Sequence, residues 1–218
     1  MYLEGDSLAF DASGTRVAAS PPPVAPLALE LAAEDPAPAV AWLGRPCQLV
    51  TPADAVACEP GLWSDRRFSE PVVAALDRGL DALRAEAGAD RLELIGYSGG
   101  GVLAALLAAR RDDVVRLVTL SAPLALQAWR RLHALGPVDA ADPARLAAPR
   151  LDATPQLHLA GARDAVVPEQ ILERYREARP EATRLLVERV DVDHGGWRPG
   201  WPERIAEIRR RLDPALAR

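Results

Sequence analysis

The chain has 218 residues, 49% of them hydrophobic, and a formal net charge of -5 at pH 7. This length favours a single domain with a sizeable core, and the acidic balance excludes the electrostatic footprint of a nucleic-acid-binding protein. None of the apolar runs is long enough to cross a bilayer, so we expect no transmembrane segment.

Strand-like segments alternate along the chain with segments whose apolar residues recur every three or four positions. Strands are expected at residues 1–4, 47–51, 91–96, 114–120, 156–160 and 184–190. Helices are expected at residues 27–33, 70–87, 100–110, 124–135, 169–178 and 202–212. This alternation predicts an α/β fold: a mostly parallel sheet of about six strands flanked by helices, in a single domain over residues 1–218.

Two stretches, residues 13–26 and 136–155, interrupt the alternation with four prolines each. The first is typical of an irregular loop, and the second belongs to a small excursion over the top of the sheet at about residues 124–155. The alternation resumes in phase after each stretch, so neither indicates a linker between domains.

The segment "LIGYSGGGVLAAL" turns from an apolar strand into a helix at Gly96-Tyr97-Ser98-Gly99-Gly100. This matches the pattern G-x-S-x-G in the context that a nucleophilic serine requires. Glycines let the helix pass close to the strand, and the helix amino end directs amide donors toward the serine oxygen. We therefore predict that Ser98 is a catalytic nucleophile. A phosphate-binding turn is disfavoured, because neither G-x-G-x-x-G nor a P-loop lysine is present.

A serine hydroxyl needs a base, usually an imidazole that a carboxylate orients. Of the three histidines, His133 lies in an expected helix and His158 in an expected strand, which favours structural roles for both. His194 follows the last expected strand on a Gly-rich loop, in "VDVDHGGW", and is our candidate for the base.

The carboxylate is expected after an intermediate strand, and "LHLAGARDAVVPEQ" places Asp164 in a turn between a strand and a helix. Asp191 and Asp193 are competitors, but they share a short loop with His194 and are badly placed to reach its far nitrogen. The predicted triad is therefore Ser98, Asp164 and His194, in that order along the chain.

These motifs together resemble the α/β-hydrolases, in which a nucleophile elbow, "G-x-x-D-x-V-V-P" and a late histidine follow one another at the carboxyl ends of successive strands. The resemblance covers nearly the whole chain. It implies an α/β-hydrolase fold and a second oxyanion donor from the loop after an early strand, to partner the amide of Gly99. In "YLEGDS", Gly5 permits the turn and the amide of Asp6, with Ser7 as the weaker alternative, is expected to point inward.

The two cysteines, Cys47 and Cys58, are too few for a zinc site and not spaced as a redox pair, which leaves either a disulfide or two free thiols. The stretches "GRPCQLVTP" and "LWSDRRF" resemble exported bacterial members of the superfamily. This narrower resemblance favours a bridge between Cys47 and Cys58 and hence a periplasmic or exported protein. Without the bridge, a cytoplasmic location is expected.

The chain departs from the family pattern at its beginning. In the family, the strand that ends at the oxyanion loop lies inside the sheet after two earlier strands, whereas here it begins at Met1. We therefore expect the natural start to lie upstream, with early strands and a leader. The strand around Cys47 would then form an edge at which a second copy could pair.

The sequence therefore predicts a serine hydrolase that acts on a small-molecule acyl compound, with a carboxylic ester as the first choice. No metal or organic cofactor is expected. A peptidase or an acyltransferase with the same triad is the first alternative, and a non-catalytic binding or envelope protein on the same fold is the second. The sequence carries no signal for an oligomeric state.

Overall fold

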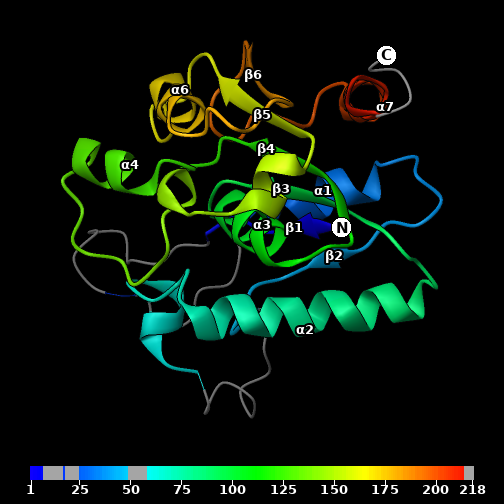
Figure 1. Cartoon of the computed structure of the whole chain (residues 1–218), viewed down its shortest axis with the longest axis horizontal. Helices are drawn as coiled ribbons and strands as arrows, with labels where there is room; N and C mark the ends of the chain where they lie inside the picture. The colour runs from blue at the N-terminus through cyan, green and yellow to red at the C-terminus, as the bar shows by residue number, and fades with distance from the viewer. Residues whose placement is uncertain (7–16, 18–24, 49–57, 214–218) are drawn as a thin grey trace.

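The structure, a computed structural model, describes residues 1–6, 17, 25–48 and 58–213. Within these residues the chain forms a six-stranded sheet in which every adjacent pair is parallel, in the order β2-β1-β3-β4-β5-β6 (Figure 1). The strands are β1 (Tyr2–Leu3), β2 (Trp42–Leu43), β3 (Leu92–Tyr97), β4 (Val114–Leu120), β5 (Gln156–Gly161) and β6 (Leu185–Val190).

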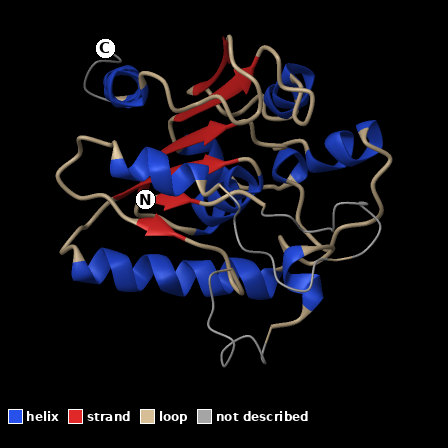
Figure 2. Ribbon diagram, turned by 180° about the vertical axis from the view of Figure 1, so that it is seen from behind, coloured by secondary structure: helices blue, strands red, loops and turns tan. Residues whose placement is uncertain are grey.

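Helices cover both faces of the sheet (Figure 2). They are α1 (Leu27–Ala33), α2 (Glu70–Glu86), α3 (Gly99–Arg110), α4 (Leu126–Leu132), α5 (Pro149–Ala153), α6 (Glu169–Glu177) and α7 (Trp201–Leu212), with short 3₁₀ turns at Pro60–Trp63 and Pro143–Arg145. One apolar cluster joins the sheet to α2, α3, α5 and α6, and a second joins it to α1 and α7.

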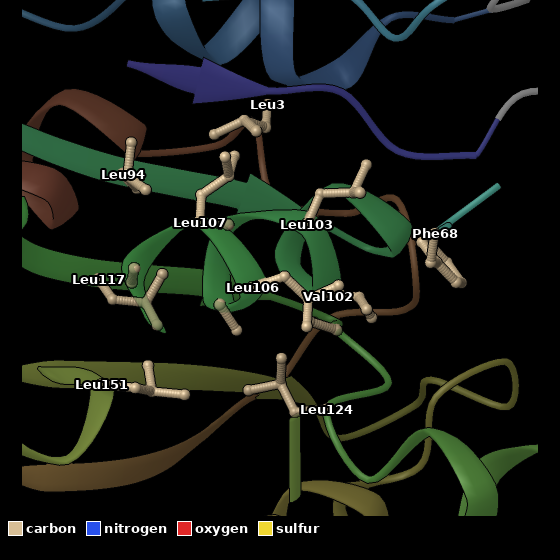
Figure 3. Packing of buried hydrophobic residues seen from close by; sticks show 14 of the residues in the cluster. Leu3, Phe68, Leu94, Val102, Leu103, Leu106, Leu107, Leu117, Leu124 and Leu151 are labelled. Atoms are coloured by element: carbon tan, nitrogen blue, oxygen red, sulfur yellow. The ribbon is translucent and has the colours of Figure 1, made fainter. Parts of the chain in front are cut away.

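The strands serve both clusters because successive side chains point to opposite faces. Leu94 lies in the first cluster and Ile95 in the second, and Leu117 and Val118 divide in the same way. Helix α3 is the central helix of the first face, with residues 99–108 all buried. Figure 3 shows its side chains packed among those of the strands and connections, including Val102, Leu103, Leu106, Leu107, Leu3, Leu94, Leu117 and Leu124.

This architecture confirms the predicted α/β sheet, but the second strand lies elsewhere than expected. Instead of a strand at residues 47–51, Cys47 and Gln48 lie in a turn, and residues 49–51 lie outside the described part of the chain. Cys47 has φ of 68°, which a strand does not permit, and Gly44 and Pro46 separate it from β2. The edge strand is therefore Trp42–Leu43.

The connection between β4 and β5 contains α4, a 3₁₀ turn and α5, where the sequence predicts the excursion at about residues 124–155. Helix α4 is shorter than the expected helix at 124–135, and the chain after it takes a left-handed conformation at Ala134. Arg179 holds the connection to α6 through the carbonyl oxygens of Pro143 and Leu146, at 2.8 and 3.0 Å. Among the described residues, no helix combines the length and the apolar character that a bilayer span requires.

Candidate active site

Ser98 occupies the sharp turn between β3 and α3. It caps the helix with φ of 49° and ψ of -123°, a left-handed conformation that costs free energy in a residue with a side chain. Its amide donates to the carbonyl oxygen of Leu120 on β4 at 2.8 Å, and this bond fixes the turn to the sheet. The turn presents the hydroxyl above the carboxyl end of β3.

The glycines around Ser98 permit a close approach of α3 to two strands. A β-carbon on Gly96 would lie 2.5 Å from the α-carbon of Gly101, and one on Gly100 would lie 2.3 Å from the carbonyl oxygen of Leu3. Any side chain at either position would therefore push backbone against backbone. This packing explains the glycine-rich sequence on both sides of the serine.

The three predicted triad residues meet in one hydrogen-bonded chain. Nε2 of His194 lies 3.2 Å from Oγ of Ser98, and Nδ1 of His194 lies 2.9 Å from Oδ2 of Asp164. Asp164 follows β5, and His194 follows β6. Because the carboxyl ends of parallel strands share one edge of the sheet, residues 98, 164 and 194 come together although 96 positions separate the first from the last.

The carboxylate of Asp164 is held in one orientation. Its side chain is fully buried, and Oδ1 accepts the amides of Val166 and Val167 at 2.9 and 2.8 Å. Burial raises the pKa of Asp164, but hydrogen bonds from His194, Ser121 and Val167 outweigh it, so the pKa lies below its usual value. Asp164 is therefore charged at neutral pH. Its charge favours the proton on Nδ1 of His194 and directs the lone pair of Nε2 toward Ser98.

Ser121 and Trp197, which the sequence does not mark as partners of the triad, support this hydrogen-bonded arrangement. Ser121, fully buried directly after β4, takes φ of 52° and hydrogen-bonds Asp164. The indole N–H of buried Trp197 lies 3.0 Å from the carbonyl oxygen of His194 and 3.2 Å from Oγ of Ser121. The sequence does hold a signal for Ser121: it is a polar residue directly after an apolar strand, at the same edge of the sheet as Ser98.

The other two histidines and the two competing aspartates take no part in the hydrogen bonds that join Ser98, His194 and Asp164. His133 ends α4, and His158 is buried inside β5. Asp191 pairs with Arg163, and the Oδ1 atom of Asp193 accepts the amide of Gly195 at 3.2 Å. Among the described side chains, no group of three or more His, Cys, Asp or Glu is arranged to hold a metal ion.

The structure also brings Asp6 and Gly99 side by side next to the serine. Gly99 is the first residue of α3, where amides lack a partner within the helix. A β-carbon on Gly99 would lie 2.3 Å from Oδ1 of Asp6, so the Asp6 carboxyl group packs directly against this glycine. Ser7, the alternative oxyanion residue, lies outside the described residues.

Cys47 and Cys58 form a disulfide, as the narrower resemblance predicts. Their α-carbons are 5.7 Å apart, within the ordinary range for a bridge. The bridge joins the chain that follows β2 to the chain that precedes α2. It mildly favours a location outside the reducing cytosol.

Comparison with solved structures finds similarity to the Pyrococcus furiosus esterase Pf2001 in two crystal forms. One form has a TM-score of 0.51 and 16% identity, over 66% of this chain and 64% of the esterase. The other has a TM-score of 0.50 and 18% identity, over 64% of this chain and 61% of the esterase.

The chain thus spans less than two thirds of the esterase, and sequences this distant show a shared fold only. No protein-family model and no curated protein matches the chain. The parallel sheet, the helices on both of its faces and this structural similarity show that the chain has the α/β-hydrolase fold.

Proposed function

We propose that the protein is a serine hydrolase that cleaves an acyl compound, most simply a carboxylic ester. The observation that carries this proposal is the hydrogen-bonded chain from Asp164 through His194 to Ser98. A serine hydroxyl is a weak nucleophile at neutral pH, and an oriented imidazole supplies the base that it needs. The fold that the chain shares with an esterase is consistent with hydrolase chemistry.

In the first half of the proposed reaction, Oγ of Ser98 attacks the substrate carbonyl carbon while Nε2 of His194 accepts the hydroxyl proton. The carbonyl oxygen becomes an oxyanion, and the backbone amides of Gly99 and Asp6 donate hydrogen bonds to it. Asp164 stabilises the imidazolium that forms. His194 then returns the proton to the leaving alcohol, and an acyl group remains on Ser98.

In the second half, a water molecule takes the place of the alcohol. His194 accepts a proton from the water as its oxygen attacks the acyl carbon, and the same amides stabilise the second oxyanion. The bond to Oγ breaks, His194 returns the proton to Ser98, and the carboxylic acid leaves. These steps use only protein groups and water.

The experiment that tests this proposal is labelling with a fluorophosphonate probe. Intact protein should be labelled, and Ser98→Ala should lose the label completely because the attacking oxygen is gone. Ser69→Ala is the matched control, since the Ser69 hydroxyl is buried and makes no hydrogen bond among the described residues. Labelling of Ser98→Ala at the wild-type level would refute the assignment, and unlabelled wild-type protein would favour the non-catalytic alternative.

A panel of substrates then separates the hydrolase classes. Acyl esters of graded length should be hydrolysed, while matched amides and added alcohol or amine acceptors should react more slowly. Faster turnover of the amides would indicate a peptidase, and transfer to the added acceptor would indicate an acyltransferase.

We also propose an exported or periplasmic location. The Cys47–Cys58 bridge supports it, because disulfides persist in oxidising compartments and are rare where glutathione keeps thiols reduced.

A further inference from the structure

Beside the serine lies a cluster of charged side chains that takes no direct part in the proposed reaction. The carboxylate of Asp6 pairs with Nη1 of Arg45 and, at 3.0 Å, with Nε of Arg67. Arg45 comes shortly after β2, and Arg67 lies just before α2. The side chains of the two arginines are only 5% and 9% exposed. Cationic side chains are rarely buried this deeply in a folded protein.

Both arginines are fixed by contacts besides Asp6. Nη2 of Arg45 donates to the carbonyl oxygen of Arg67 at 2.5 Å, and Nη1 of Arg67 donates to that of Ser64 at 2.6 Å. Their guanidinium carbons also lie 5.2 and 4.9 Å from the centre of the Phe68 ring, within reach of cation–π attraction. The pair is therefore a rigid support and not a pair of free side chains.

Several carboxyl groups lie around the two arginines. Burial lowers the pKa of Arg45 to about 9 and that of Arg67 to about 10, so both groups remain cationic at neutral pH. Asp6 pairs with both arginines, and the carboxyl groups of Glu4 and Asp65 lie close enough to act on Arg45 and Arg67, respectively. Glu4 is buried and accepts the indole N–H of Trp42 at 3.0 Å. These acidic neighbours disfavour the cluster as a binding site for an anionic substrate.

The cluster reaches the active site through Asp6. Its carboxyl group is held by the two arginines on one side and packs against Gly99 on the other, where a β-carbon would lie 2.3 Å from Oδ1. Only the β-carbon separates this group from the Asp6 α-carbon, which carries the backbone amide. Fixing the carboxylate therefore restricts the direction of that amide.

We infer that Arg45 and Arg67 clamp the side chain of Asp6 and thereby hold its backbone N–H in position as the second oxyanion donor. The two arginines are positioning residues, because they act through Asp6 and do not touch the reacting atoms. This inference rests on the proposed function of Ser98. It predicts a defect in transition-state stabilisation, with little effect on substrate binding, when the clamp is broken.

The test compares Asp6→Asn and Arg67→Lys with wild-type protein. Asp6→Asn keeps the backbone amide and the side-chain shape but removes the charge, and lysine cannot reproduce the guanidinium contacts of Arg67. For an acyl ester, each variant should lower kcat about 10- to 100-fold while KM stays within about twofold. The double variant should be about as slow as either single one, because both break the same unit.

Arg110→Ala is the matched control. It removes an arginine that pairs with Glu70 at 2.9 and 2.7 Å between α2 and α3, on the exposed surface, and it should leave kcat unchanged. Thermal unfolding of every variant shows whether the fold is kept. Asp6→Asn protein that remains folded and retains wild-type kcat would overturn the inference.

Hydrogen exchange provides a readout that does not depend on activity. The Gly5 amide donates to Oε1 of Glu4 at 3.0 Å and reports on the loop that carries Asp6. Its exchange should become faster in Asp6→Asn and Arg67→Lys and remain unchanged in Arg110→Ala. The two proposals fail separately. Wild-type protein that does not react with the fluorophosphonate probe would refute the proposed hydrolase. A Gly5 exchange rate that is the same in all variants would refute the clamp.

Discussion

His158 is a fully buried histidine outside the candidate site. Its Nδ1 lies 2.9 Å from the hydroxyl of Thr119, and its Nε2 lies 3.0 Å from Oε1 of Gln156, which also accepts the hydroxyl of Tyr175 at 2.9 Å. The amide oxygen of Gln156 cannot donate, so Nε2 carries the proton and Nδ1 accepts from Thr119. Burial lowers the pKa of His158 to about 3, and the ring is neutral in the folded protein.

This burial predicts a loss of stability in mild acid. The unfolded chain binds a proton at His158 near pH 6.5, whereas the folded chain does so only near pH 3, so stability falls as pH drops between these values. From pH 7 to pH 5 the group should remove about 2 kcal/mol of unfolding free energy. Urea denaturation of wild type and His158→Gln at both pH values measures this loss.

His158→Gln should be less stable at pH 7 and should lose less stability on acidification than wild type. His133→Gln, which removes a half-buried histidine directly after α4, is the matched control. An equal fall in wild type and His158→Gln would contradict this account.

At the scale of elements, the start of α3 decides how closely the helix packs on the sheet. A β-carbon on Gly100 would lie 2.3 Å from the carbonyl oxygen of Leu3 and 2.5 Å from that of Glu4. Both obstacles are backbone atoms, so a change of rotamer cannot relieve the contact. The helix and β1 would have to move apart, and the candidate oxyanion loop follows β1 directly.

Gly100→Ala should therefore destabilise the fold by about 3 kcal/mol, at the upper end of the usual cost of overpacking. Gly136→Ala is the matched control, because a β-carbon there meets no atom within 4 Å, and its unfolding free energy should change by less than about 1 kcal/mol. Urea denaturation of the two variants measures the difference. Equal stabilities would show that α3 adjusts to a side chain at this position.

At the scale of the whole molecule, Arg209 ties the last helix to the beginning of the chain. From α7 it contacts both carboxylate oxygens of Asp35, beyond α1, at 2.6 and 2.7 Å, and Oε1 of Glu93 on β3 at 2.7 Å. Asp35 also accepts the hydroxyl of Tyr2 at 2.7 Å, and its side chain is fully buried. One cation thus joins three elements on the face covered by α1 and α7.

Arg209→Ala should lower the unfolding free energy by about 3 kcal/mol, because it leaves the buried Asp35 carboxylate without its cation. The double variant Asp35→Asn/Arg209→Met should lose less, since neither partner then keeps an unpaired charge. Arg210→Ala, one position along the same helix, is the control and should stay near wild type. Thermal or urea denaturation of the four proteins measures these differences, and equal losses in both arginine variants would argue against the tie.

Much of this fold follows from local patterns. The helix at residues 27–33 and the strand at residues 114–120 have the expected bounds, because apolar periodicity and breaking residues act within a few positions. Strand β2 was missed, since two residues carry no periodicity and are defined as a strand by pairing with β1. Helix α5 was also missed, because its five residues are too few to show a helical periodicity.

Ser98, Asp164 and His194 could be predicted in type and chain order from local patterns, because each follows a strand in a recognisable context. Only the tertiary structure placed their side chains within hydrogen-bonding distance, and only it revealed the contacts of Ser121 and Arg45. A local pattern records the neighbours of a residue along the chain, whereas these contacts join segments that meet when parallel strands align their carboxyl ends at one edge of the sheet.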